Sequence, residues 1–206
     1  MRTVGSKGET TELMLRQAGV RLIAKYGYES VSLRMLAKEV GIQAGSLYNY
    51  INNKQEFLFD LLASIIRDLV EEMTQELDGL TDPPERLRAF IKRHIDFHTR
   101  RKEEVFIGNM ELRSLTAENF KVIQRMRDEY EAILGGIIED GVKAGRFHCS
   151  DPTITKLAII TMLTAIASWY KPEGRRRIDT LTAEYTDLIF LMLRAEKATS
   201  EAIVAA

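Results

Sequence analysis

Cysteine is almost absent from this sequence, because Cys149 is the only one in 206 residues. No disulfide can form within the chain, and nothing indicates an oxidising compartment. The first residues also lack the apolar run, about 7 to 15 residues long, of a secretory signal. We therefore expect a cytoplasmic protein.

A long hydrophobic run is missing too. The most apolar stretch, residues 157–170, is interrupted by Thr161, Thr164 and Ser168. A membrane-spanning helix needs about 20 consecutive apolar residues, so this stretch is too short to cross a bilayer. We expect no membrane partner and interpret the stretch as a buried helix.

Motifs of catalysis and cofactor binding are missing as well. The sequence has no glycine-rich phosphate loop, no Gly-x-Ser-x-Gly motif and no cysteine cluster. His94 and His98 stand four residues apart, a spacing at which two histidines on one helical face can share a metal ion. However, Ile95 occupies the position where metalloproteases carry a glutamate, and no third ligand is defined. We predict no catalytic residue, no metal and no cofactor, and interpret the pair as a polar patch or the wall of a ligand pocket.

Charge is nearly balanced over the whole chain, with a formal net charge of −1, 45% apolar and 29% charged residues. This composition is ordinary for a soluble globular protein and gives no overall nucleic-acid signal. The distribution is more informative. Residues 1–54 carry eight Lys or Arg against four acids, a net of +4, which leaves −5 for the rest. A basic N-terminal part on an acidic body is typical of a protein that contacts phosphates at one end.

Residues 32–54 have the layout of a helix-turn-helix. Apolar residues recur at three- and four-residue steps and form one helical face: Leu33, Leu36, Ala37 and Val40. Gly41 then ends the helix, because glycine reaches the left-handed backbone region that a sharp corner requires. Ile42 and Leu47 are placed to fill the corner from inside. A second short helix, about residues 43–50, keeps small and polar side chains on its outer face, which favours DNA binding.

This segment resembles the TetR family of transcriptional repressors. The residues that carry the resemblance are Leu36-Ala37, Gly41-Ile42, Gly45-Ser46-Leu47-Tyr48, Tyr50-Ile51 and Lys54-Gln55-Glu56-Phe57-Leu58. The resemblance implies operator DNA as a partner. It also implies that Tyr48 and Lys54, with Tyr50 as a third, contact phosphates without reading the base sequence.

Base contacts are expected from the outer face of the second helix, where Gln and Asn can pair with adenine and Ala can touch a thymine methyl group. Gln43 replaces the serine usual in the family, and Asn49 stands where His or Tyr is more usual, so the operator sequence does not follow from the resemblance. Arg34 either reaches a phosphate or is solvated. The predicted DNA-binding residues are Arg34, Gln43, Ala44, Gly45, Ser46, Tyr48, Asn49, Tyr50 and Lys54.

The remaining periodicity is helical throughout. It predicts a support helix that closes at Gly27, a long helix over residues 53–77, and later helices whose N-caps include Thr116 and Asp151. We predict an all-α fold of about nine helices. A three-helix helix-turn-helix DNA-binding domain is expected at residues 9–52, a helical effector-binding and dimerisation domain at 53–195, and a disordered tail at 196–206.

The helix predicted over residues 152–170 is apolar on almost every face, so it must be covered on every face. We place it, with the helix over 178–193, in the interface of a homodimer that forms a four-helix bundle. The alternative is that both helices are simply central core. The predicted interface residues are Leu157, Ile160, Leu163, Ile166, Trp169, Tyr185, Leu188 and Met192.

A narrower resemblance lies in the body. Residues 111–115, 127–131, 138–141, 145–147 and 169–174 are similar to the TetR subgroup that controls fatty-acid or sterol catabolism and responds to acyl-coenzyme A thioesters. The resemblance implies a small apolar effector, with an acyl-coenzyme A thioester as the candidate, bound among seven residues. The alternative is that the apolar members of this set are ordinary helical core. The seven residues are Phe97, Phe106, Met110, Arg113, Tyr130, Leu163 and Trp169.

Together these patterns predict a ligand-responsive repressor, released from its operator when an effector tilts the helix over residues 53–77. Two alternatives stay open. One is a helical protein-interaction module without DNA binding, and the other is a metal-binding enzyme built on His94 and His98.

Overall fold

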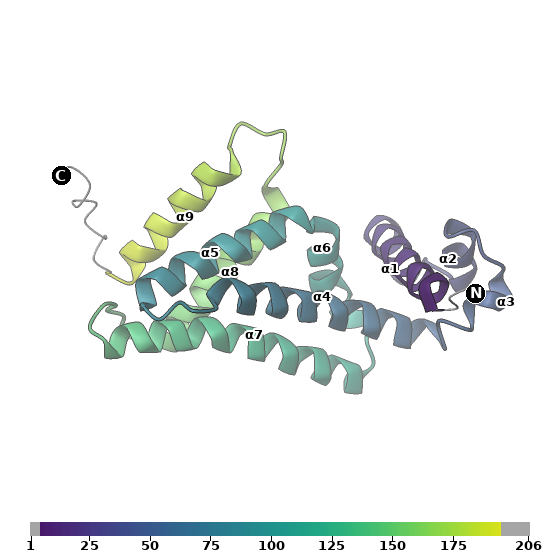
Figure 1. Cartoon of the computed structure of the whole chain (residues 1–206), viewed down its shortest axis with the longest axis horizontal. Helices are drawn as coiled ribbons and strands as arrows, with labels where there is room; N and C mark the ends of the chain where they lie inside the picture. The colour runs from purple at the N-terminus through teal and green to yellow at the C-terminus, as the bar shows by residue number, and fades with distance from the viewer. Residues whose placement is uncertain (1–4, 195–206) are drawn as a thin grey trace. The chain divides into compact units, whose positions relative to one another are not determined.

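The computed structural model describes residues 5–194, and this range contains helices and no strand (Figure 1). In chain order the elements are α1 Gly5–Tyr26, α2 Leu33–Glu39, α3 Ala44–Leu47, α4 Lys54–Leu77, α5 Pro83–Arg100, α6 Lys102–Met110, the 3₁₀ helix η1 Glu111–Ser114, α7 Ala117–Lys143, α8 Pro152–Trp169 and α9 Ile178–Met192. The predicted all-α fold is confirmed. The predicted tail at 196–206 lies outside the described residues.

The chain divides into two compact units. The N-terminal unit comprises the residues up to Val70 together with Arg101–Asp128, and the C-terminal unit comprises Glu71–Arg100 and the residues from Glu129 onward. Helices α4 and α7 contribute residues to both. The predicted domain limits, 9–52 and 53–195, follow the DNA-binding motif rather than packing, and they stay predictions.

The helix ends follow the signals in the sequence. Ser32 caps α2, since its hydroxyl accepts the N–H of Met35 at 3.2 Å, and Asp151 caps α8, with Pro152 as the first helical residue. Gly27, directly after α1, has a φ angle of +77°, and Gly41, directly after the C-cap Val40 of α2, has a φ angle of +73°. These left-handed positions turn the chain sharply without the Cβ clash that another residue would suffer.

One helix is shorter than the spacing predicts. Helix α3 covers only Ala44–Leu47, because the Leu47 carbonyl accepts both the Tyr50 and the Ile51 N–H and the chain continues as turns. Leu47 still faces the inside of the corner, so the pattern was correct and the boundary was wrong.

In the N-terminal unit, α1 and α4 approach closely at Gly19. A Cβ atom at Gly19 would lie 2.5 Å from Cζ of Phe57, so any other residue at position 19 would require the ring or the helices to shift. An ion cluster joins α1, α4 and α6: Asp68 lies 2.5 Å from Arg16 and 2.7 Å from Arg101, and Arg101 also pairs with Glu104. The buried apolar side chains of this unit include Leu15, Ala18, Ile23, Leu36, Leu47, Leu58 and Leu62.

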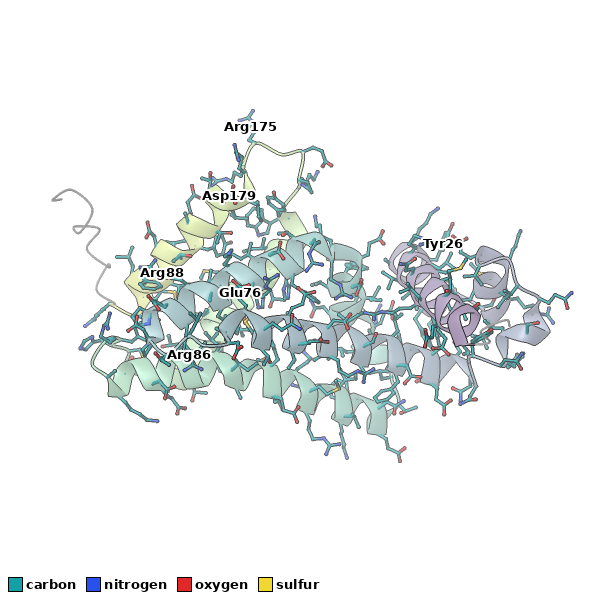
Figure 2. The ribbon with its side chains drawn as sticks, viewed as in Figure 1. Tyr26, Glu76, Arg86, Arg88, Arg175 and Asp179 are labelled. Carbon is teal, nitrogen blue, oxygen red and sulfur yellow. The ribbon has the colours of Figure 1, made fainter. Side chains whose placement is uncertain are left out.

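In the C-terminal unit, α5 packs against α8 and α9. Phe90, Ile91 and Ile95 of α5 are fully buried, as are Leu163 and Ile166 of α8. The Arg88 guanidinium lies 4.1 Å from the centroid of the Phe190 ring of α9 (Figure 2). The amphipathic pattern of α5 therefore faces an apolar layer of its own unit, as helix packing requires.

Candidate nucleic-acid interface

The corner between α2 and α3 is held by apolar side chains from both helices. Leu36 and Ala37 of α2 and Leu47 of α3 are buried, and Ile51 closes the far side. After Gly41, the Ile42 N–H returns to the Ala37 carbonyl at 2.9 Å, which completes the cap of α2. The corner is filled from inside by buried side chains, so the outer residues of α3 have a defined orientation within the N-terminal unit.

The residues predicted to contact base edges lie on the outside of this corner. Gln43, Ala44, Ser46 and Asn49 are exposed. Gly45 is exposed as well, and a Cβ placed on it would meet no atom within 4 Å. The packing of the protein therefore does not require glycine at position 45. A close approach of the DNA backbone to this position would require it.

The residues predicted to contact phosphates fall into two groups. Tyr48 is 60% exposed and Tyr50 is 37% exposed, and Arg34 is also on the surface. Lys54 is half-buried: its Nζ donates to the Glu29 carbonyl at 3.1 Å and lies 4.1 Å from the centroid of the Tyr28 ring. This ammonium thus joins the start of α4 to the turn before α2. The assignment of all these residues to DNA stays a prediction.

The sequence analysis did not predict that Tyr28 contacts Lys54 in the turn before α2. Its side chain is buried, and burial raises the pKa of its hydroxyl. The residue stands directly after Gly27, in the turn that leads into α2. An aromatic residue after a helix-ending glycine was the only signal, because the lysine that covers its ring comes 26 positions later in the printed sequence.

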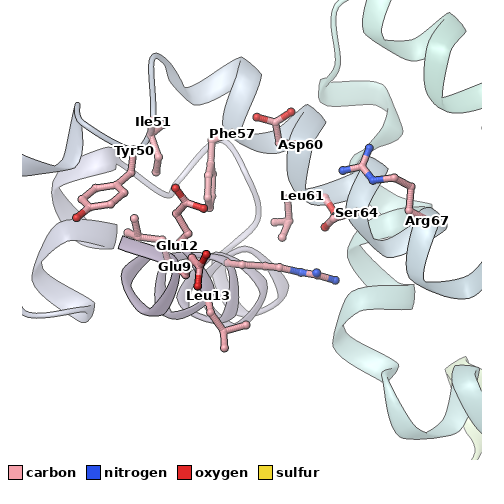
Figure 3. Close-up of a pocket in the computed structure, with 12 residues that line it drawn as sticks. Glu9, Glu12, Leu13, Tyr50, Ile51, Phe57, Asp60, Leu61, Ser64 and Arg67 are labelled. Carbon is pink, nitrogen blue, oxygen red and sulfur yellow. The ribbon is translucent and has the colours of Figure 1, made fainter. Parts of the chain in front are cut away.

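A cleft of about 400 Å³ lies between α1 and α4 in the same unit, with Tyr50 and Ile51 at its border (Figure 3). Phe57 and Leu61 supply apolar walls from α4. Three carboxylates, from Glu9, Glu12 and Asp60, and two guanidinium groups, from Arg16 and Arg67, also line it. Because the acids outnumber the bases, the lining has no excess of positive charge that would attract phosphate, so we do not count the cleft as part of the nucleic-acid surface.

The predicted effector residues are distributed over both units. Phe97, Tyr130 and Leu163 are buried in the C-terminal unit, where Trp169 is exposed and stacks on Tyr185. Phe106, Met110 and Arg113 belong to the N-terminal unit and are exposed. The grouping of these seven residues around one ligand stays a prediction.

The histidine pair forms a buried polar cluster. Nδ1 of His94 lies 2.8 Å from the Tyr130 hydroxyl, and Nε2 lies 3.3 Å from the Thr164 hydroxyl. Burial, and then the neighbouring His98, hold the pKa of His94 well below its usual value, so the ring is neutral. Both ring nitrogens of His94 have protein partners. Among residues 5–194 no group of three or more His, Cys, Asp or Glu side chains is placed to hold a metal ion.

The predicted dimer residues separate into core and surface. Ile160, Leu163 and Ile166 are buried in the core of their own unit, and Tyr185 is half-buried. Leu157, Trp169, Leu188 and Met192 are exposed, together with Ile154 and Leu191, which the sequence analysis missed. Ile154 precedes Leu157 by one helical turn and Leu191 follows Leu188 by one, so helical spacing was the available signal.

Helix α8 is unusual within the described range. By length and composition it is the one helix apolar enough to cross a membrane, and only 22% of it is buried within the chain. Such a helix also occurs in the core or at the subunit interface of a water-soluble protein. The expectation of a fully buried helix is therefore not met by this chain alone.

Comparison with known proteins gives two consistent results. Residues 15–61 match the family described as bacterial regulatory proteins, tetR family, and residues 80–193 match the tetracyclin repressor-like C-terminal domain. The HTH-type transcriptional repressor KstR2 of Rhodococcus jostii (strain RHA1) is 25% identical, over 91% of this chain and 92% of that protein. The fatty acid metabolism regulator protein of Bacillus subtilis (strain 168) is 26% identical, over 65% of this chain and 69% of that protein.

A solved structure extends the comparison. The crystal structure of AibR in complex with isovaleryl coenzyme A and operator DNA superposes with a TM-score of 0.79 at 25% identity. It covers 90% of this chain and 100% of the other. The similarity includes both the helix-turn-helix segment and the C-terminal helices.

Proposed function

Because the chain belongs to the tetR family of bacterial regulatory proteins, we propose that it represses transcription as a homodimer on operator DNA and is released by a small apolar effector. The observation that carries the proposal is the exposed outer face of α3 on a corner whose inside is filled by buried apolar side chains. In helix-turn-helix proteins this second helix enters the major groove. KstR2 of Rhodococcus jostii, which matches over 91% of the chain, is a transcriptional repressor.

The proposed DNA contacts are of two kinds, contacts to base edges and contacts to phosphates. The amides of Gln43 and Asn49 offer the paired donor and acceptor that read adenine, and Ala44 and Ser46 permit close approach. Tyr48 and Tyr50 donate their hydroxyls to phosphates, with Arg34 adding charge. Lys54 contributes a positive charge to the same surface while it remains attached to the turn at Glu29.

The homodimer uses the exposed apolar face of α8 and α9. Ile154, Leu157 and Trp169 on α8 and Leu188 and Leu191 on α9 are exposed and apolar. A face of this kind marks a protein interface. A second copy of the same two helices would complete a four-helix bundle and cover it.

The effector belongs to the acyl-coenzyme A thioesters in this proposal. The support is indirect: one similar structure holds isovaleryl coenzyme A together with operator DNA, and one relative regulates fatty acid metabolism. Thermal unfolding with a panel of acyl-coenzyme A thioesters, free fatty acids and steroids tests the assignment. A ligand at 100-fold its dissociation constant adds about 2.7 kcal/mol of stability. A panel in which no thioester raises the melting temperature would contradict it.

We further propose that the protein has no enzymatic activity and works in the cytoplasm. The relatives found are transcriptional regulators, and both ring nitrogens of His94 are occupied by protein groups.

Mobility shift with genomic DNA fragments tests the central proposal. We expect complexes on a small subset of fragments, with an affinity that falls as salt is raised, because phosphate contacts release counterions. A protein that shifts no fragment even at low salt would be a helical interaction module instead.

A further inference from the structure

Helix α1 ends differently from the other helices that close on a left-handed glycine. After Gly41 and Gly145, the next N–H returns to its own helix: Ile42 N–H to Ala37 O at 2.9 Å and Arg146 N–H to Gly141 O at 2.8 Å. After Gly27 the pattern changes. The Gly27 N–H takes the Ile23 carbonyl at 2.8 Å, and the Tyr28 N–H bonds outside the helix.

The outside partner is Glu111, a carboxylate of η1. Its Oε1 accepts the Tyr28 N–H at 3.1 Å, across 83 positions of sequence, and its Oε2 accepts the Ser114 hydroxyl at 2.8 Å. The Glu111 side chain is buried, and a buried acid is retained only where its oxygens are satisfied. Neither the proposed DNA contacts nor the proposed effector contacts use it.

Around Glu111 the contacts form a closed circuit. The Ser114 carbonyl accepts from Gln55 Nε2 at 2.7 Å, and Gln55 follows Lys54, whose ammonium lies over the Tyr28 ring. The same η1 segment therefore holds the chain before α2, at Tyr28, and at the start of α4, at Gln55. The whole helix-turn-helix lies between these two attachments.

We infer that Glu111 is a positioning residue for DNA binding. Its carboxylate accepts the Tyr28 N–H, which would otherwise bond a carbonyl of α1, and so sets the orientation of the helix-turn-helix. The inference rests on the proposed function. Without Glu111, the Tyr28 N–H turns back toward the Ile23 carbonyl, as its counterparts after Gly41 and Gly145 do. Residues 28–31 then rotate, and α2 and α3 meet the groove at a different angle.

The test uses the full chain and a DNA duplex selected by the wild-type protein from a random-sequence pool. We expect Glu111→Ala to bind this duplex about tenfold or more weakly, because an unsatisfied buried N–H is costly enough to change the turn. Glu111→Gln keeps a carbonyl oxygen for the Tyr28 N–H and should bind nearly as the wild type does. Glu103→Ala is the matched control, since it removes one exposed acid from α6. Glu103 stands eight residues before Glu111, the first residue of η1, which is about two helical turns.

Hydrogen–deuterium exchange gives a readout that does not depend on DNA. In Glu111→Ala the amide of Val31, whose N–H bonds the Tyr28 carbonyl at 3.1 Å, should exchange faster because residues 28–31 rotate, while the α4 amides keep their protection. In Glu111→Gln and Glu103→Ala the exchange of the Val31 amide should not change. If the alanine variant does not fold, Glu111→Asp, which keeps the charge and withdraws the carboxylate by one methylene group, replaces it with the same expectation.

Two results would overturn the inference alone: wild-type affinity in a folded Glu111→Ala or Glu111→Asp protein, or equal weakening by Glu111→Gln. A wild-type protein that selects no duplex would instead contradict the proposed function.

Discussion

The rings of His94 and His98 lie stacked inside the C-terminal unit, with centroids 3.8 Å apart and planes inclined by only 8°. Nδ1 of His98 donates to the His94 carbonyl at 2.8 Å, which fixes this ring against its neighbour. Two positive charges at this separation would repel strongly in a buried site. The arrangement therefore favours a neutral His94.

Stability should consequently decrease in mild acid. The pKa of His94 in the folded protein is well below 6.5, owing first to burial and then to His98, whereas in the unfolded chain it is ordinary. Below about pH 6.5 the unfolded chain binds the extra proton, so the free energy of unfolding should fall by up to about 1.4 kcal/mol per pH unit. Denaturant titrations between about pH 5 and 8 measure this slope. In His94→Gln the slope should be smaller, and an unchanged slope would contradict the assignment.

Asp68 should be important for the stability of the N-terminal unit. Burial alone would raise its pKa, but hydrogen bonds and charge from Arg16 and Arg101 outweigh it and lower the pKa. Asp68→Asn leaves both guanidinium groups without this partner, and we expect a loss of about 1–3 kcal/mol in chemical denaturation. The stabilisation from the ionised carboxylate is present above its unfolded pKa and is lost as pH falls toward its lowered folded pKa. Glu139→Gln, which breaks an exposed pair with Lys143, should change stability by less than about 0.5 kcal/mol.

Gly19→Ala should be destabilising although it replaces glycine by the best helix former. The new Cβ would lie 2.5 Å from the Phe57 ring, so α1 and α4 must separate or the ring must move. We expect a loss of about 1–3 kcal/mol in thermal or denaturant unfolding. Gly108→Ala in α6 is the control, because its Cβ meets no atom within 4 Å and helix propensity should make it neutral or stabilising. Equal behaviour of the two variants would exclude the steric explanation.

Charge on the apolar face of α9 should prevent dimerisation. Leu191 is 67% exposed, so Leu191→Glu is tolerated by the isolated chain but would bury an unpaired carboxylate in the proposed four-helix bundle. We expect a folded monomer by light scattering, with operator affinity reduced by more than about tenfold. Leu13→Glu on α1 alters another exposed leucine, which belongs to the N-terminal unit rather than to α8 or α9, and it should leave the mass of the particle unchanged. A dimeric Leu191→Glu protein would exclude this face.

Substitutions on the DNA face should separate affinity from sequence preference. Tyr48→Phe removes one exposed hydroxyl and should weaken binding to all sequences about equally. Asn49→Ala removes a base-reading amide, which should cost about 1–3 kcal/mol on the selected duplex and relax the preference at one position. Selection from a random pool with each variant measures both effects. A changed preference in Tyr48→Phe would contradict its assignment to phosphate.

Local chemistry was sufficient to predict which segments become helices and where several of them begin and end. Ser32 and Asp151 cap helices as expected, and Gly27 and Gly41 turn the chain as expected. These features depend on groups within about four residues of one another, so the sequence contains the complete interaction.

Only the tertiary structure decided how the segments use their side chains. Spacing placed Ile160 and Leu157 on one apolar helix, but packing within the unit buries the first and leaves the second exposed. The Tyr28 amide meets Glu111 because α1 and α6 pack together, and no local pattern specifies a partner 83 residues away. The sequence thus determined a helical chain with a helix-turn-helix. Long-range packing determined that Glu111 holds this motif and that the apolar face of α8 and α9 remains exposed. The reason is that the burial of a side chain depends on all the elements that surround it.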